Sequence, residues 1–156
     1  MISSAELQKK RRLPSSALPI CLREGALLAV GGCGYYALEL AFRGFSHWSM
    51  AICGGVCLQS IYHMNKRLIR KSICLRALLG SAIITAAELI CGILVNLTFH
   101  LGVWDYSHLP FNLWGQICLP FSLLWAALCL PVCAVCSFVE TGRLYLPSAA
   151  TRRARS

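Results

Sequence analysis

The chain has 156 residues, of which 57% are hydrophobic and 13% are charged, whereas a soluble domain carries about 25% charged residues. The hydrophobic residues are concentrated in blocks, and a helix needs roughly 20 apolar residues to cross the hydrocarbon core of a bilayer. These features exclude an ordinary soluble domain and predict an all-α, polytopic transmembrane helical bundle.

The basic residues alternate with the apolar blocks. They cluster at residues 9–23, 66–76 and 143–155, and only Arg43 lies elsewhere. Cytoplasmic loops of membrane proteins carry such an excess of Lys and Arg, whereas a nucleic-acid site would gather basic residues on one folded surface. The net charge of +9 therefore indicates a topology with both termini cytoplasmic, and we expect no nucleic-acid partner.

The apolar blocks predict about four membrane-spanning helices within residues 25–140, at about 25–42, 48–65, 75–99 and 113–139. We expect residues 1–24 to form a flexible basic cytoplasmic segment and residues 141–156 a basic cytoplasmic tail. The fourth span contains Pro120 and Pro131, and proline removes a helix hydrogen bond. The sequence leaves open whether this span is one kinked helix or two shorter pieces.

The first and third spans carry acidic residues. Glu39 precedes Arg43 by four residues, a spacing that places both side chains on one helix face, where they are able to pair. Glu88 lies deeper, where desolvation disfavours the ionised carboxyl. It belongs to a polar stripe at three- and four-residue steps that should face protein or water rather than lipid. The stripe consists of Ser81, Thr85, Glu88, Gly92 and Asn96.

The connection between the last two spans contains turn and cap formers around Asp105 and Asn112. A turn explains most of this segment, and we hypothesise that Asp105 also meets Arg43. Trp104 falls at the outer end of a span, where aromatic rings favour the headgroup layer. Gln116 lies one turn beyond Asn112 and is expected to point into the same cavity.

These residues form one candidate cluster, whose role is either binding or structural. Its members are Glu39, Arg43, His47, Glu88, Asn96, Asp105, Asn112 and Gln116. We expect no catalytic residue, because the chain has no P-loop, no G-x-S-x-G and no H-E-x-x-H motif. We also expect no metal and no cofactor, because the histidines do not converge and Cys133 and Cys136 form a CxxC without a second pair.

Two groups of motifs together resemble the family named "Putative ABC-transporter type IV", a group of small bacterial membrane proteins labelled as ABC transporter permeases. The first group is Glu39-x-x-x-Arg43-Gly44, Ser46 to Met50 and Gly54-Gly55, and the second is Glu88, Gly92, Asn96, Trp104 to Ser107, Pro110, Asn112 and Gly115 to Cys118. The resemblance covers about residues 28–130. It implies a multi-pass protein of the bacterial plasma membrane that serves as a permease or a membrane subunit of a transport system.

Such a subunit would need a separate ATPase or a homo-oligomeric pathway, because four helices hardly enclose a solute route. The alternative is a non-transporting membrane scaffold or regulatory protein, in which the polar residues only lock helix packing. An intramembrane enzyme acting on lipid ranks last, because no nucleophile or metal set is visible.

Overall fold

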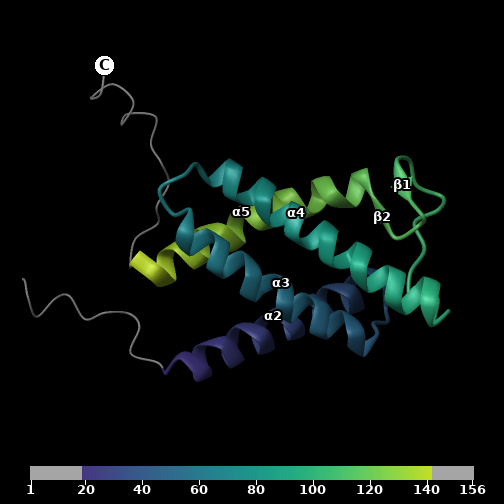
Figure 1. Cartoon of the computed structure of the whole chain (residues 1–156), viewed down its shortest axis with the longest axis horizontal. Helices are drawn as coiled ribbons and strands as arrows, with labels where there is room; N and C mark the ends of the chain where they lie inside the picture. The colour runs from purple at the N-terminus through teal and green to yellow at the C-terminus, as the bar shows by residue number, and fades with distance from the viewer. Residues whose placement is uncertain (1–18, 142–156) are drawn as a thin grey trace, which may run out of the picture.

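The computed structural model describes residues 19–141 and shows an all-α bundle, as the sequence predicts. Its elements are α2 (Ile20–Arg43), α3 (Trp48–Arg67), α4 (Ile73–Gly92), the π-helix η1 (Ile93–Thr98), β1 (Asn112–Leu113), β2 (Ile117–Cys118) and α5 (Leu119–Thr141). Successive helices run in opposite directions, so that residues 19 and 141 lie at the same end of the bundle (Figure 1). We call this the terminal end, and the opposite end, which carries residues 99–118, the loop end.

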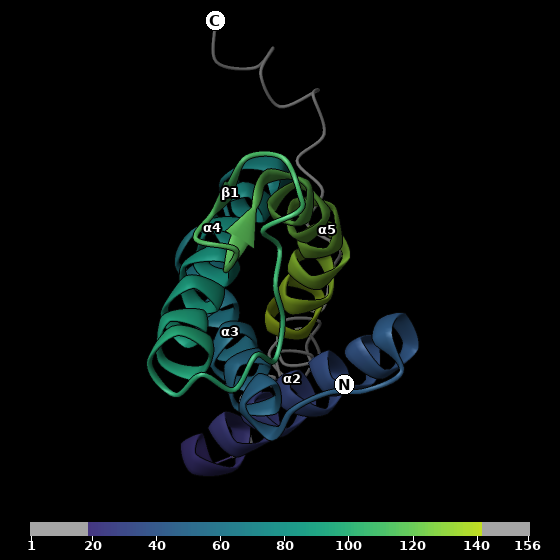
Figure 2. The same ribbon diagram turned by 90° about the vertical axis from the view of Figure 1, so that its right-hand side faces the viewer.

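The bundle consists of two helical hairpins, α2 with α3 and α4 with α5, and α3 also packs on the second hairpin. Viewed end-on, α2 crosses the other helices obliquely at the edge of the bundle (Figure 2). The α2–α3 contact is close because glycine lies at the crossing. A Cβ atom added to Gly55 would lie only 2.7 Å from the carbonyl oxygen of Leu28. Small residues allow this kind of close approach between membrane helices.

Three helical segments within residues 19–141 are long and apolar enough to cross a membrane: Ile20–Arg43, Ile73–Thr98 and Leu119–Thr141. The remaining predicted span, α3, has the lowest apolar content because polar residues occupy its second half. It also contributes many of the buried residues of the bundle, among them Met50, Ile61 and Asn65. The protein is therefore a multi-pass membrane protein in which α3 is largely enclosed by protein.

The helix bounds differ from the expected spans at two places. Helix α2 begins at Ile20, so the last residues of the predicted flexible segment are helical. Helix α5 begins at Leu119 rather than near residue 113, because residues 112–118 form a short antiparallel hairpin. Pro120 lies in the first turn of α5, where its missing N–H needs no partner. Helix α5 is continuous through Pro131, so the fourth span is not two separate pieces.

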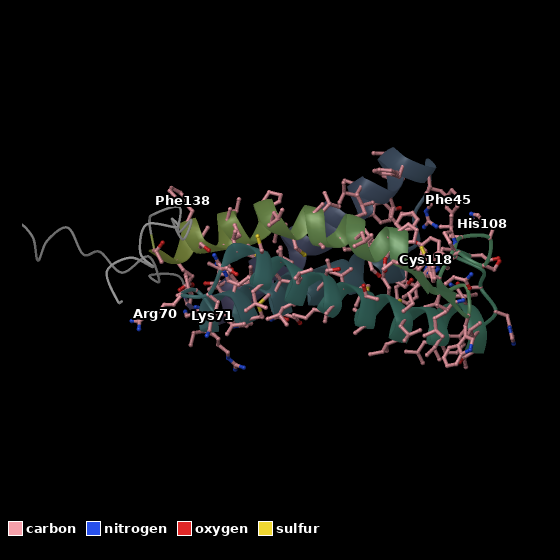
Figure 3. The ribbon with its side chains drawn as sticks, turned by 90° about the horizontal axis from the view of Figure 1, so that it is seen from above. Phe45, Arg70, Lys71, His108, Cys118 and Phe138 are labelled. Atoms are coloured by element: carbon pink, nitrogen blue, oxygen red, sulfur yellow. The ribbon has the colours of Figure 1, made fainter. Side chains whose placement is uncertain are left out.

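A buried polar clamp joins α3, α4 and α5 near the terminal end. Arg76 is fully buried, and its Nη1 donates to Asn65 Oδ1 and to Ser137 Oγ, each at 2.6 Å. Ser137 in turn donates to the carbonyl oxygen of Cys133 at 2.7 Å. The sequence places Arg76 in a cytoplasmic loop, and this is wrong, because the guanidinium lies inside the bundle. By contrast, Arg70 and Lys71 project from the same end (Figure 3).

Two acidic residues complete the polar network of the terminal end. Glu24 on α2 accepts hydrogen bonds from Gln59 and pairs with His63 at 2.9 Å, which fastens α2 to α3. Glu140 on α5 accepts a hydrogen bond from the hydroxyl of Tyr62 and pairs with Lys66 at 3.2 Å. These residues are compensated locally, and we interpret this end of the bundle as structural.

Replacing Ser137 by alanine should destabilise the protein by about 1.5–3 kcal/mol, because the buried Arg76 loses an acceptor for a charged hydrogen bond. Reversible unfolding of the purified protein in detergent measures this change. The matched control is Ser60→Ala, since the Ser60 hydroxyl has no hydrogen bond within residues 19–141. Equal effects of the two substitutions would contradict the clamp.

Candidate functional site

Glu88 is the most deeply placed acidic residue of the loop-end half. Its side chain is on α4, and the residue is only 2% exposed. One carboxylate oxygen accepts a hydrogen bond from the Tyr35 hydroxyl of α2 at 3.2 Å, and the other accepts from Nε1 of Trp125 of α5 at 2.9 Å. Both donors are neutral, and Glu88 forms no ion pair within residues 19–141. Three helices thus meet at one carboxylate without a cationic partner.

A cavity of about 90 Å³ lies between α2 and α5. It is lined by Tyr35 and Trp125, the two donors to this carboxylate, and not by Glu88 itself. Five of its lining residues are aromatic: Tyr35, Phe42, Tyr106, Phe121 and Trp125. We call it the aromatic cavity. The rings of Tyr35 and Trp125 are tilted, with centroids 5.7 Å apart, and those of Tyr106 and Phe121 stack at 4.6 Å. Burial raises the pKa of the Tyr106 phenol, so this ring adds no charge at neutral pH.

Glu39 and Arg43 form the predicted ion pair at the edge of the aromatic cavity, with Arg43 Nη2 2.6 Å from Glu39 Oε1. The second carboxylate oxygen of Glu39 accepts from Ser46 Oγ at 2.5 Å. Arg43 also donates from Nη1 to the carbonyl oxygen of Val103 at 3.1 Å, which ties the end of α2 to the long loop. The two opposite charges cancel, so the pair adds no net charge to the cavity.

Asn96 and Gln116 form a second polar pair, which holds the loop to the third span. The Asn96 amide donates to Gln116 Oε1 at 2.8 Å and accepts from the backbone N–H of Val103 at 2.7 Å. Asn96 lies in the π-helix η1, an irregularity that shifts the following residues around the helix axis. Gly92 makes room for the pair, because a Cβ atom there would lie 2.5 Å from Gln116 Oε1. This pair is therefore structural.

The predicted contact between Asp105 and Arg43 is not formed. The exposed carboxylate of Asp105 accepts instead from the backbone N–H of Ser107 at 2.8 Å and from its hydroxyl at 2.9 Å. These two bonds lower the pKa of Asp105. Asn112 spans the same turn, donating to the carbonyl oxygens of Ser107 and Leu109. Asp105 and Asn112 therefore shape the turn.

Two further residues have local structural roles. His47 is the N-cap of α3, where its Nδ1 accepts from the backbone N–H of Ser49 at 3.4 Å. Trp104 does not face the headgroup layer as predicted but is 6% exposed, and its Nε1 donates to the carbonyl oxygen of Gln116 at 2.9 Å. The loop is therefore folded against the bundle rather than floating above it.

The structure thus divides the predicted cluster into four parts. Glu88 binds two residues of the aromatic cavity, which has the Glu39–Arg43 pair at its edge. Asn96 and Gln116 anchor the loop, Asp105 and Asn112 form its turn, and His47 caps α3. The sequence analysis missed Trp125, the second donor to Glu88. The one available signal is that Trp125 is a tryptophan far from either end of an apolar helix, where its indole N–H must find a buried acceptor.

Replacing Asn96 by leucine should speed amide hydrogen exchange at Val103 by about tenfold or more, because an unpaired buried N–H costs about 1–3 kcal/mol. Exchange measured by mass spectrometry should rise across residues 101–104. Asn112→Leu serves as the control, since its bonds lie within residues 107–115, and should leave Val103 protected. Unchanged exchange at Val103 in the Asn96 variant would refute this anchor.

Reversing the charges of Arg43 and Asp105 together should give additive losses of stability, with a coupling energy within about 0.5 kcal/mol of zero. The same exchange at Glu39 and Arg43 should show a clear favourable coupling, because these two side chains are paired. Double-mutant cycles of unfolding in detergent measure both. Rescue of Arg43→Glu by Asp105→Lys would show that Asp105 does reach Arg43.

The chain was also compared with known proteins. The family model described as "Putative ABC-transporter type IV" matches residues 25–151. The comparisons with curated proteins and with solved structures found no match. The matched segment contains every residue of the loop-end half described above. The protein therefore belongs to the family described as "Putative ABC-transporter type IV" and is an ABC-transporter-related, multi-pass membrane protein.

Proposed function

We propose that this protein is a permease, or the membrane subunit of a transport system, with its polar site centred on Glu88. The observation that carries the proposal is a buried carboxylate that has only neutral hydrogen-bond donors, Tyr35 and Trp125, both of which line a cavity. An acidic residue at the centre of a membrane helix costs about 2.5–3.5 kcal/mol on insertion scales. Such residues usually mark solute or proton pathways in membrane proteins.

The way in which each carboxylate is neutralised separates Glu88 from the other acids on the described helices. Glu24, Glu39 and Glu140 each pair with a basic side chain. Glu88 has no such partner within residues 19–141, so either a proton or an entering cation must neutralise it. Membership of an ABC-transporter-related family agrees with a transport role. Because the chain has no P-loop, we propose that a separate ATPase hydrolyses ATP and that this chain is not itself an enzyme.

The solute pathway is proposed to include a second copy of the chain, since four helices leave little room for a route. An open groove of about 460 Å³ runs along α4 and α5 and presents mainly small side chains. They include Ser81, Ala82, Thr85, Ala86 and Ala126. Small residues are typical of helix–helix interfaces in membranes. With both termini cytoplasmic, as the basic clusters predict, the loop end would face outward from a bacterial plasma membrane.

A non-transporting scaffold or regulator remains the second candidate function, and one observation favours it. Most residues of the predicted cluster satisfy one another or bind the loop backbone, as Arg43 does at Val103 and Asn96 at Trp104. On that reading, Glu88 would only hold three helices together. The two candidates differ in whether Glu88 is needed for activity or for stability.

Purification of the full chain from its native membranes in mild detergent should recover a nucleotide-binding ATPase subunit with ATP hydrolysis. Glu88→Gln should lower the hydrolysis of this complex by about tenfold, because a transport site acts on a separate ATPase through a coupling free energy of about 1–3 kcal/mol. Membrane levels and subunit composition should not change. Glu140→Gln is the matched control, because Glu140 lies at the terminal end. Absence of an ATPase, or loss of the protein instead of its activity, would favour the scaffold.

A further inference from the structure

The aromatic cavity is a small, partly open space lined by five aromatic rings. Ring faces are electron-rich and attract cations, most strongly for tryptophan. Two of these rings, Tyr35 and Trp125, donate their polar hydrogens to the carboxylate of Glu88. Donation to an anion pushes electron density back into a ring and strengthens its attraction for a cation.

The charges around the cavity also favour the binding of a cation. Glu39 and Arg43 neutralise each other at the edge, with 2.6 Å between the paired atoms. Glu88 lies directly behind the Tyr35 and Trp125 rings and has no cationic partner within residues 19–141. The cavity and its surroundings therefore have a surplus of one carboxylate, which a cation would compensate.

The size of the cavity limits what enters it. Its volume is about 90 Å³ and it is open on one side, whereas drug-sized ligands occupy about 300–1,000 Å³. Only a small head group fits. The side of the cavity between α2 and α5 is flanked by apolar side chains that face the bilayer, including Phe42 at 75% exposed and Leu38 at 44% exposed. A chain attached to the head group would leave through this side into the acyl region.

We propose that the aromatic cavity binds the methylated ammonium head of an amphiphilic cation, whose apolar chain extends between α2 and α5 into the bilayer. This inference rests on the proposed function, because it names the substrate class of the site at Glu88. The cation enters laterally from the membrane. The positive charge of its head group neutralises the carboxylate of Glu88 in place of a proton.

The test uses the full chain in lipid nanodiscs and two probes of equal chain length, hexyltrimethylammonium and hexanesulfonate. Isothermal titration calorimetry, corrected with empty nanodiscs, should show saturable binding of the cation and none of the anion. Phe42→Leu and Phe138→Leu form a matched pair, since both rings are exposed to the bilayer and Phe138 lies at the terminal end (Figure 3). Phe42→Leu should weaken cation binding by about tenfold, as expected for one lost cation–π contact, and Phe138→Leu should not.

Glu88→Gln should also weaken binding of hexyltrimethylammonium, and Glu140→Gln should leave it unchanged. If Glu88→Gln does not fold, the comparison of Phe42→Leu with Phe138→Leu still tests the proposal. Equal binding of both probes, preferential binding of hexanesulfonate at Arg43, or equal effects of the two Phe variants would overturn the proposal.

The outcomes also separate this inference from the proposed function. Specific cation binding without a partner ATPase would support the cavity assignment and remove the transport role. An ATPase complex that depends on Glu88 but binds no hexyltrimethylammonium would keep the transport role and overturn the substrate class.

Discussion

The loop-end half of the bundle depends on the carboxylate of Glu88, because hydrogen bonds from two other helices end on it. Helix α2 packs mainly along α3, and its hydroxyl-to-carboxylate bond at Tyr35 is one of the few links to the second hairpin. Trp125 supplies the corresponding link from α5. Glu88 therefore links α2, α4 and α5 at one point.

Buried charged groups have different kinds of partner at the two ends of the bundle. At the terminal end, Arg76 is fully buried, but oxygen acceptors from α3 and α5 surround its guanidinium. Removing a partner from such a network is costly, which favours a fixed arrangement. At the loop end, Glu88 is held by two neutral donors, Tyr35 and Trp125, which line the aromatic cavity. A closed network suits a permanent joint, whereas an uncompensated carboxylate beside a cavity suits a group that changes its partner.

Much of the architecture follows from sequence periodicity, but the site follows only in part. The polar stripe on the third span places Ser81 and Glu88 on one face, and the structure turns that face toward α5, where Ser81 donates to the carbonyl oxygen of Ser122. The four-residue spacing of Glu39 and Arg43 likewise predicts their ion pair. Spacing within a helix cannot show which residue of another helix lies opposite, so Trp125 was missed.

Local signals also failed where tertiary contacts overrode them. Positive charge near a membrane helix usually indicates a cytoplasmic loop, but Arg76 is drawn into the bundle by acceptors that lie 11 and 61 residues away along the chain. Trp104 is withdrawn from the surface because a backbone carbonyl accepts its indole N–H. In both cases a tertiary hydrogen bond outweighs the preference of the residue for the interface, and the periodicity of residues along one helix does not reveal such a partner.

The loop contributes to the site by holding Tyr106 in a fixed position at the aromatic cavity. Asn96 and Gln116 hold its two ends against η1 and α5, and the stacking of Tyr106 on Phe121 fastens its middle to the start of α5. Tyr106 is thereby a fixed wall of the aromatic cavity. The seam between α2 and α5 lacks such backbone anchors near the cavity and is bordered by leucines that face the bilayer. The aromatic cavity is therefore bounded by an anchored loop on one side and by apolar side chains of the two helices along this seam.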